Sequence, residues 1–586
     1  MPSAKGPERA GDRFHFDLPG ELRVEVDRIV EEWRRDDNVR RLWAGDETLW
    51  TRSGESRWTG WLEAAADAAA HEALGRAADA ARSRVLAERP RDVLLIGMGG
   101  SSLCPEVLSA TFGPVDGFPR LGILDSTDPA TVRRVGDTLD PESTLFIVSS
   151  KSGTTLEPEV LREYMFDRAA GALGAAKAAR RFMVITDPGS ALEARAERDG
   201  YLAIHHGVPS IGGRYSALSA FGMIPAAMMG CDVPGLLEGA RRMAGTCSPE
   251  TPIRDNTAVV AGIILGVAAR GGRDKVTLIP SPALRHFGAW LEQLLAESTG
   301  KNGRGLIPVD GERIAPPDRY GKDRVFVHLR HPHDDADHDA AMGHLASAGH
   351  PVLTFDIADR LELGGEFLRW ECATAVAGAV LGVNPFDQPD VEASKEAARL
   401  LTREYEKTGT LPREHPIAVG SGLRLFADAA NERALGSAAG KDPSVTDWIR
   451  AHLGRLAPGD CFTLLAWLDR DAATASRIDR IRHAIRDGRR VATSVGFGPR
   501  YLHSTGQIHK GGPDSGVFLL VTCGDAVDLP IPGRSASLGT IRAAQARGDF
   551  DVLAARGRRV LRCDLGTDVI EGIEALAAQV ERALRS

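Results

Sequence analysis

Two short segments rich in glycine and hydroxyl side chains have the composition of anion-binding loops. Residues 97–102 (Gly-Met-Gly-Gly-Ser-Ser) and 149–157 (Ser-Ser-Lys-Ser-Gly-Thr-Thr-Leu-Glu) each follow an apolar run and precede a helical pattern. Backbone amides, hydroxyls and a lysine can all donate hydrogen bonds to phosphate. The first segment lacks the third glycine of a dinucleotide fingerprint, and neither matches a P-loop. The pair therefore predicts a site for one phosphate monoester with a modest organic tail.

Three further side chains could supply acid–base and electrostatic chemistry. Arg214 follows two glycines and could stabilise negative charge that develops on a substrate oxygen. Gln293 and Glu297 are four residues apart in a helical pattern and share one face near the end of that helix. A carboxylate partly shielded from water at this place could act as a general base. Taken alone, each of these residues could equally be an ordinary surface side chain.

Lysine is rare in this chain, and its positions are informative. Only ten of the 72 basic residues are lysine, and four of these ten lie in the segments that could carry chemistry: Lys151, Lys301, Lys395 and Lys510. A lysine can change its protonation state and presents a compact ammonium group, whereas arginine does neither. Lys395 lies about one turn into a helix that a proline-rich segment, 384–392, introduces.

Short apolar runs alternate with helical patterns from residue 91 onward, which predicts parallel sheets built from βαβ units. The expected strands are 93–96, 121–124, 145–148, 182–185, 276–279, 325–329, 352–355, 462–467, 491–495, 517–521 and 560–565. The predicted organisation is a helical N-terminal extension (1–90), two α/β domains (91–235 and 236–410) and a C-terminal α/β domain (411–586). Parallel strands end at one edge of their sheet, so the two phosphate loops should face the same crevice.

Composition excludes several classes of protein. The chain has 586 residues, a formal charge of −8 and no basic footprint for nucleic acid or an anionic membrane. Its seven cysteines are scattered, as is typical of reduced thiols in the cytoplasm. We see no secretory signal and no span of about 20 apolar residues, so we expect a soluble cytoplasmic protein. The histidine- and aspartate-rich segment 331–338 contains zinc-type ligands, but its hydrophilic surroundings favour a solvated loop.

Five segments, 96–102, 149–157, 211–216, 293–301 and 384–395, together resemble the phosphoglucose isomerase family. They occur in the order found in that family, between about residues 91 and 400. Within the family, they are most similar to the isomerase half of bacterial transaldolase–isomerase fusion proteins. The resemblance implies tandem sugar-isomerase (SIS) domains, each a flavodoxin-like three-layer sandwich with a parallel sheet, here followed by the additional C-terminal α/β domain. It also implies a homodimer with active sites at the dimer interface, a sugar-phosphate substrate, and no metal or redox cofactor. Whether a separate transaldolase is a partner stays open.

The resemblance also implies roles for individual residues. The phosphate would be held by the two loops, through Gly99, Gly100, Ser101, Ser150, Lys151, Ser152, Thr154 and Thr155. Glu157 matches a carboxylate near the phosphate loop, and Gln293 would position the substrate. Glu297 would be the base and Arg214 would stabilise the enediolate. Lys395, seven residues after Gln388, would assist ring opening.

The sequence departs from the family at the histidine that opens the sugar ring. No histidine follows a Gly-Gln pair between 301 and 386, whereas Gly506-Gln507-Ile508-His509 lies in the C-terminal domain. We expect His509 to supply this function, with His503 and Lys510 close by. His350, just before a predicted strand, is the alternative.

The predicted activity is the reversible isomerisation of glucose 6-phosphate and fructose 6-phosphate through a cis-enediol, as in glycolysis and gluconeogenesis. One alternative is a related isomerase or epimerase that acts on a mannose or amino-sugar phosphate. Another is a non-catalytic sugar-phosphate sensor, although no helix-turn-helix or basic arm is evident and the reactive residues are all retained.

Overall fold

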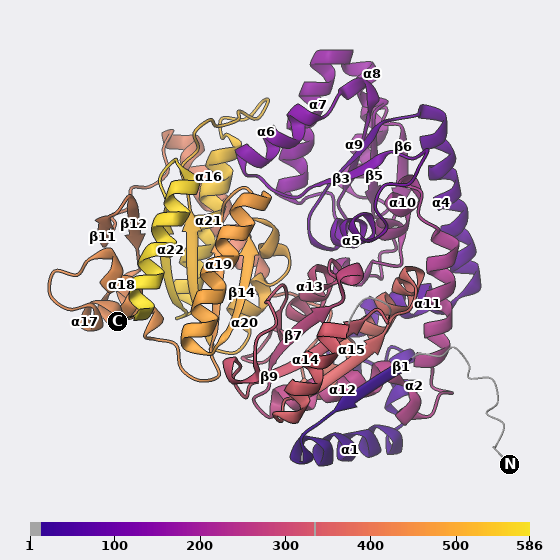
Figure 1. Ribbon diagram of the computed structural model, residues 1–586. Coiled ribbons are helices and arrows are strands. Elements are labelled where there is room, and N and C mark those ends of the chain that lie inside the picture. Colours follow the sequence, from indigo (N-terminus) through magenta and orange to yellow (C-terminus); the bar gives the residue numbers. More distant parts are fainter. Residues whose placement is uncertain (1–12, 333–335, 586) are drawn as a thin grey trace.

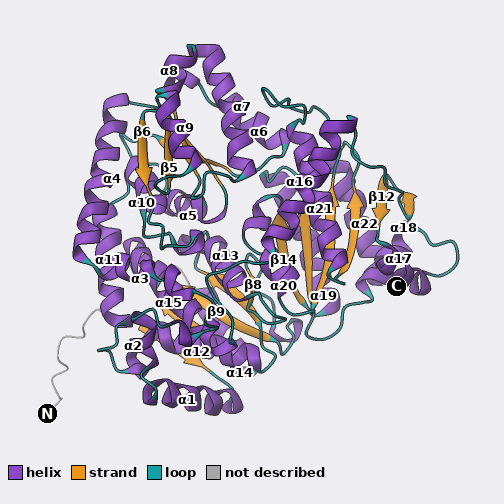
Figure 2. Ribbon diagram, turned by 180° about the vertical axis from the view of Figure 1, so that it is seen from behind, coloured by secondary structure: helices purple, strands orange, loops and turns teal. Residues whose placement is uncertain are grey.

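Three sheets, each with helices packed on it, make up the computed structural model, which describes residues 13–332 and 336–585. The first two α/β units lie against each other, and the C-terminal unit, coloured orange to yellow in Figure 1, lies beside both. Figure 2 shows from behind how helices enclose each sheet. Within the described ranges, no helix is both long and apolar enough to cross a lipid bilayer.

The first domain is a parallel five-stranded sheet with the order β3-β2-β4-β5-β6. Its strands are β2 (Asp92–Gly97), β3 (Arg120–Leu124), β4 (Thr144–Ser149), β5 (Phe182–Thr186) and β6 (Ala203–His206). Its helices are α5 (Leu103–Phe112), α6 (Pro129–Thr138), α7 (Leu156–Leu173), α8 (Ala175–Ala179), α9 (Ala191–Asp199) and α10 (Ala220–Met228). Alternate strand residues enter two separate apolar cores: Leu95 and Ile147 face α5 and α10, whereas Leu94 and Phe146 face α6, α7 and α9. This burial on both faces produces a three-layer sandwich.

The second domain has the sheet order β1-β10-β9-β7-β8. Its strands are β7 (Lys275–Pro280), β8 (Ile307–Val309), β9 (Arg324–Arg330), β10 (Val352–Asp356) and the antiparallel edge strand β1 (Arg13–Asp17). Its helices are α11 (Val233–Cys247), α12 (Thr257–Arg270), α13 (Phe287–Thr299), α14 (Ala336–Ser347), α15 (Leu363–Leu381) and α16 (Val391–Thr408). α15 is buried on nearly all sides, because α11, α12 and α13 all pack against it. Its core is continuous with one core of the first domain.

The C-terminal domain has the sheet order β11-β12-β16-β15-β13-β14, in which the last four strands are parallel. Its strands are β11 (Ala418–Gly420), β12 (Leu423–Phe426), β13 (Cys461–Ala466), β14 (Ala492–Phe497), β15 (Gly516–Thr522) and β16 (Arg559–Asp564). Its helices are α17 (Ala429–Ala439), α18 (Val445–Leu453), α19 (Ala472–Arg489), α20 (Gly506–Gly511), α21 (Leu538–Ala555) and α22 (Val569–Arg585). One core lies under α18, α19 and α22, and a second lies under α21.

The sequence-based expectations for the fold are largely confirmed, since every expected strand forms and the α/β sandwich architecture is present. The N-terminal segment differs from the expected helical extension. Besides α1 (Gly20–Arg35), α2 (Asn38–Trp43), α3 (Gly60–Ala66) and α4 (Ala68–Glu88), it contains β1, which completes the second domain's sheet. The helical stretch 60–88 is divided into α3 and α4 because Asp67 caps α4. The boundary predicted at 235 falls inside α11, whereas 411–416 has no regular structure.

Candidate active site

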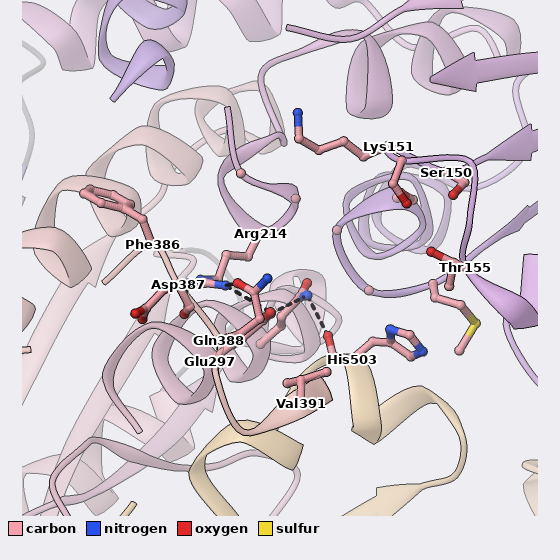
Figure 3. Close-up of a pocket in the computed structure, with 18 of the residues that line it drawn as sticks. Ser150, Lys151, Thr155, Arg214, Glu297, Phe386, Asp387, Gln388, Val391 and His503 are labelled. Carbon is pink, nitrogen blue, oxygen red and sulfur yellow. Dashed lines mark hydrogen bonds and ion pairs between the residues drawn. The ribbon is translucent and has the colours of Figure 1, made fainter. Parts of the chain in front are cut away.

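A cavity of about 550 Å³ lies at the carboxyl ends of the first domain's strands, with walls from all three domains. Ser101, Ser150 and Thr155 come from the first domain, Glu297 and Lys395 from the second, and His503 from the C-terminal domain. Figure 3 shows the labelled side chains surrounding this space. The sequence analysis singled out most of these residues, and the fold brings them together from positions up to 402 residues apart in the chain.

The first phosphate loop is the 3₁₀ helix Gly99–Ser101, directly after β2. Gly99 has a φ of +55°, and a Cβ there would lie 2.7 Å from the amide nitrogen of Gln293. A Cβ on Gly100 would lie 1.9 Å from the carbonyl oxygen of Gly213. Gly99 is therefore required for the turn and for close packing against Gln293, and Gly100 for close packing against the Arg214 segment. They place Ser101, which is buried, at the cavity wall.

The second phosphate loop connects β4 to α7, with Thr155 as the N-cap residue of α7. Ser150, Lys151, Ser152 and Thr155 line the cavity, whereas Thr154 is exposed and does not. The Lys151 ammonium pairs with Asp187 and donates to the carbonyl of Pro209 at 3.2 Å. In Figure 3 this side chain extends away from Glu297. Hydroxyls and the amides at the start of α7 are thus the donors left for an anion.

Glu297 lies on the cavity face of α13, held between two partners. Its Oε1 forms an ion pair with Nη1 of Arg214 at 2.9 Å, and its Oε2 accepts a hydrogen bond from Nε2 of Gln293 at 2.9 Å. Gln293 Nε2 also donates to the carbonyl of His503 at 2.7 Å. The Oε1 of Gln293 is buried with no hydrogen-bond partner in the described parts of the chain. Gln293 lines the cavity, and this oxygen is a hydrogen-bond acceptor that no described group uses.

Arg214 uses all five of its N–H groups within the protein. Besides Glu297, its acceptors are Ser298 Oγ at 2.8 Å, Gln388 Oε1 at 3.0 Å, and the carbonyls of Pro385 and Asp387 at 2.9 and 2.8 Å. A guanidinium group has five N–H donors in a rigid plane. Arg214 therefore fixes both the carboxylate of Glu297 and the turn that carries Gln388.

Lys301 also stabilises the turn at 384–388, before α16. The Lys301 ammonium donates to the carbonyl of Asn384 and pairs with Asp387 at 3.0 Å. Burial, and then the charge of Arg214, lower the pKa of this lysine to about 7. Lys301 does not line the cavity, whereas Gln388 and Lys395 do. Lys395 is half-buried, and its Nζ donates to Glu392 at 2.7 Å.

The histidine at the cavity is His503, which ends the short 3₁₀ helix Arg500–His503 after β14. Its Nε2 lies 3.0 Å from Oε1 of Glu157, and its Nδ1 has no hydrogen-bond partner in the part of the chain that the structure describes. Glu157 is buried beneath the cavity wall and does not line it. Burial alone would raise the pKa of Glu157, but the charge and hydrogen bond of His503 hold it below its ordinary value.

His509, the histidine expected from the sequence, lies elsewhere. Its ring packs between Tyr501 and Phe518, with centroid separations of 6.0 and 5.3 Å, and it does not line the cavity. Burial, and then Lys510 and Arg558, lower its pKa well below the ordinary value. The alternative, His350, packs against Phe326 in the second domain and is also outside the cavity. Lys510 pairs with Asp549 inside the C-terminal domain.

Several cavity residues were not singled out by the sequence analysis. Trp58, Met98, Asp187 and Phe386 line the cavity. His503 was expected only as a neighbour of His509. Its role could have been inferred from one signal, because it follows the strand 491–495, and binding residues of parallel sheets lie at the carboxyl ends of strands. Trp58 carries no such signal, because it reaches the cavity from the N-terminal segment through the pairing of Thr59 with Ile211.

The structure offers no obvious metal-binding group in its described residues. No cluster of three or more histidine, cysteine, aspartate or glutamate side chains there could hold an ion. The segment 331–338 is covered in part only, since His333, Asp334 and Asp335 lie outside the described residues. The interpretation of this segment as a solvated loop therefore stays a prediction.

Comparisons with known proteins agree with this geometry. Residues 85–313 match the family model described as phosphoglucose isomerase. Over 361 residues, the chain is 33% identical to a glucose-6-phosphate isomerase of Rubrobacter xylanophilus, covering 53% of this chain and 82% of that one. A probable glucose-6-phosphate isomerase of Haloarcula marismortui is 30% identical over 401 residues, covering 61% and 87% of the two chains.

Two solved structures share the fold. A hypothetical protein of Thermus thermophilus superposes with a TM-score of 0.56 and 25% identity, over 66% of this chain and 99% of that one. A glucose-6-phosphate isomerase from Chlamydia trachomatis superposes with a TM-score of 0.55 and 20% identity, over 68% and 89% of the two chains.

Proposed function

The chain belongs to the phosphoglucose isomerase family, and we propose that it interconverts glucose 6-phosphate and fructose 6-phosphate in this cavity, through a cis-enediol. The observation that carries the proposal is the position of Glu297: a carboxylate held by Arg214 and Gln293 at one side of a cavity whose other side is a hydroxyl-rich anion site.

Binding begins at the phosphate. Ser101, Ser150 and Thr155, with the amides at the start of α7, supply donors without a competing carboxylate, because Asp187 is already paired with Lys151. An anchored phosphate holds the far end of the sugar and so limits where its first two carbons can lie. That restriction supplies much of the orientation that catalysis requires.

Ring opening comes next, and we assign its acid to His503. The carboxylate of Glu157 accepts from Nε2–H and fixes the orientation of the ring, which leaves Nδ1 without a partner among the described residues. In its protonated form Nδ1 donates to the ring oxygen. Lys395, on the same cavity wall, assists by stabilising the hydroxyl oxygen at the anomeric carbon as that hydroxyl releases its proton to water, and His503 regains a proton from water. This assignment replaces His509 by a residue of the same domain.

Glu297 then moves one proton between the two carbons. In the direction of fructose 6-phosphate, it takes the proton from C2 of the open chain and returns it to C1, so no net proton is consumed. Arg214 is paired with Glu297, the residue next to the reacting carbons, so its positive charge lies close to the enediolate and stabilises it. The free Oε1 of Gln293 accepts from a substrate hydroxyl and orients the reacting carbons.

All of these groups belong to a single chain. The homodimer that the resemblance implies, and a separate transaldolase, stay predictions. We propose that the C-terminal domain supplies in the same chain the histidine that completes the site, so that the catalytic unit is one chain whatever its oligomeric state.

The test is a coupled assay of fructose 6-phosphate conversion in the presence of EDTA, with wild type beside Glu297→Gln. We expect the variant to lose about 10³-fold in kcat while it binds substrate normally. Mannose 6-phosphate and an amino-sugar phosphate, assayed in parallel, distinguish a related isomerase. A wild type that binds fructose 6-phosphate without converting it would indicate a sensor, and comparable rates for the two proteins would remove Glu297 from the mechanism.

A further inference from the structure

A glutamine of the C-terminal domain, Gln545, contacts Glu157, the carboxylate that is hydrogen-bonded to His503. We propose that Gln545, on α21, is a positioning residue for ring opening: it fixes the carboxylate of Glu157, which in turn orients His503. This inference rests on the proposed function, because it assigns Gln545 to one step of that reaction.

The contacts form a continuous buried chain. The hydroxyl of Thr127 donates to Oε1 of Gln545 at 2.9 Å, and Nε2 of Gln545 donates to Oε1 of Glu157 at 2.7 Å. The same carboxylate oxygen lies 3.0 Å from Nε2 of His503. Thr127, Gln545 and Glu157 are each at most 4% exposed.

The direction of each hydrogen bond is determined by the carboxylate of Glu157, which can only accept. A hydroxyl that donates to the amide oxygen leaves the NH₂ group turned toward Glu157, and the reversed amide would place an oxygen against a carboxylate. A buried carboxylate needs donors to stay ionised. Gln545 supplies one neutral donor, so Glu157 stays ionised and can accept from Nε2–H of His503.

Docking of the two domains does not depend on this glutamine. Arg542, one turn earlier on α21, pairs with the buried Asp128, and Arg500 pairs with Asp125. Further along the interface, Arg534 pairs with Glu163 at 2.6 Å. The Arg542 pair holds α21 against the first domain, and the other two pairs hold neighbouring segments of the C-terminal domain there, whereas the Gln545 amide is the group that continues to Glu157.

One turn after Gln545, the same helix face supports the other ring-opening residue. Asp549 accepts hydrogen bonds from Ser394 Oγ at 3.1 Å and from Tyr501 Oη at 2.6 Å. Ser394 directly precedes Lys395, and Tyr501 precedes His503 by two residues. α21 therefore supports both sides of the ring-opening pair, and the amide of Gln545 is its direct link to the histidine.

The test separates ring opening from the later proton transfer. The variants are Gln545→Leu and Thr127→Val, with Arg534→Gln as an interface control. The substrates are fructose 6-phosphate and 5-deoxyfructose 6-phosphate, which cannot close a furanose ring because it lacks the C5 hydroxyl. We expect Gln545→Leu to lose about tenfold or more in kcat on fructose 6-phosphate and less than twofold on the acyclic analogue.

The pH profile gives a second readout. A buried carboxylate that loses a donor is less stable as an anion, so the hydrogen-bonded pair of Glu157 and His503 should hold its proton more tightly, and the alkaline limb of kcat for fructose 6-phosphate should move to higher pH. Thr127→Val should shift it in the same direction, and Thr127→Ser and Arg534→Gln should not move it. Equal losses on both substrates, or an unmoved limb in both Gln545→Leu and Thr127→Val, would overturn the inference.

Failure of the proposed function would appear differently. In that case the wild type would not convert either substrate, or Glu297→Gln would be as active as the wild type on both. If Gln545→Leu does not fold, Thr127→Val carries the same comparison, because it keeps the shape of the side chain and removes only the hydroxyl that donates to the amide.

Discussion

Arg214 shows how much of the site is built by one side chain. Its five N–H groups hold Glu297, Ser298, Gln388 and two carbonyls of the 385–387 turn. It therefore links the catalytic helix α13 to the turn that introduces α16. A lysine has three donors on one nitrogen and cannot reproduce five directions in a plane.

We predict that Arg214→Lys lowers kcat by about 10²-fold or more, because Glu297 loses its positioning and the enediolate loses a fixed charge. The affinity for an unreactive hexitol 6-phosphate should change little, since the phosphate loops are untouched. Steady-state kinetics and calorimetric titration measure the two quantities. The exposed Arg285→Lys serves as a control, and a kcat within threefold of the wild type for Arg214→Lys would contradict the role given to Arg214.

At the scale of elements, α13 separates two cavities. One of its faces carries Gln293 and Glu297, and the adjacent face carries Glu292, which lines a second cavity of about 260 Å³ with Asp310 and Arg482. Burial, and then the charge of Asp310, raise the pKa of Glu292 to about 8. The folded protein therefore keeps a proton on Glu292 that the unfolded chain, with a pKa near 4.5, releases.

This shift predicts a pH dependence of stability. The stability that the protonated Glu292 contributes is complete below pH 4.5 and is lost as the pH rises toward 8, by about 1.4 kcal/mol per pH unit at most. Glu292→Gln should therefore gain stability over the wild type as the pH is raised from 5 to 8. Urea unfolding at a series of pH values measures this. The exposed Glu432→Gln should show no such trend, and a constant difference between Glu292→Gln and the wild type would refute the account.

The sequence predicted the elements better than the contacts between distant ones. The strands predicted between 93 and 565 are confirmed, because short apolar runs flanked by turn residues are typical of parallel strands that are buried on both faces. β1 was missed because its partner, β10, lies about 340 residues away. His509 was chosen because it follows a Gly-Gln pair, but α20 turns its ring toward Phe518, whereas His503 faces the cavity. Local sequence contains no information on that rotation.

At the scale of the whole molecule, the C-terminal domain is a third wall of the active site. Its contacts with the other two domains are both apolar and polar. Ile531, Leu538 and Ile541 pack into a core of the first domain. Arg542–Asp128 and Arg500–Glu106 ion pairs also join it to that domain, and Gln507 donates to the carbonyl of Gly300 of the second domain at 2.9 Å. This wall supplies His503 from the same chain as Glu297.

A complementation experiment tests that organisation. Glu297→Gln and His503→Ala are unfolded together in equal amounts and refolded. If each chain carries its own complete site, the mixture should have only the mean activity of the two variants. If the histidine served a neighbouring subunit, about a quarter of the sites would be restored, because half of the dimers would be mixed and one of their two sites intact. Co-refolded wild type provides the reference.

The central claim is that the carboxylate of Glu297 moves a proton between two carbons. The most direct measurement is NMR of fructose 6-phosphate incubated in D₂O with wild type or Glu297→Gln. The account predicts that wild type forms glucose 6-phosphate with deuterium partly incorporated at C2, because a proton held by a carboxylate exchanges with solvent. In the variant, turnover and incorporation should both fall by about 10³-fold while a hexitol 6-phosphate still binds. Incorporation by Glu297→Gln at more than a tenth of the wild-type rate would contradict the claim.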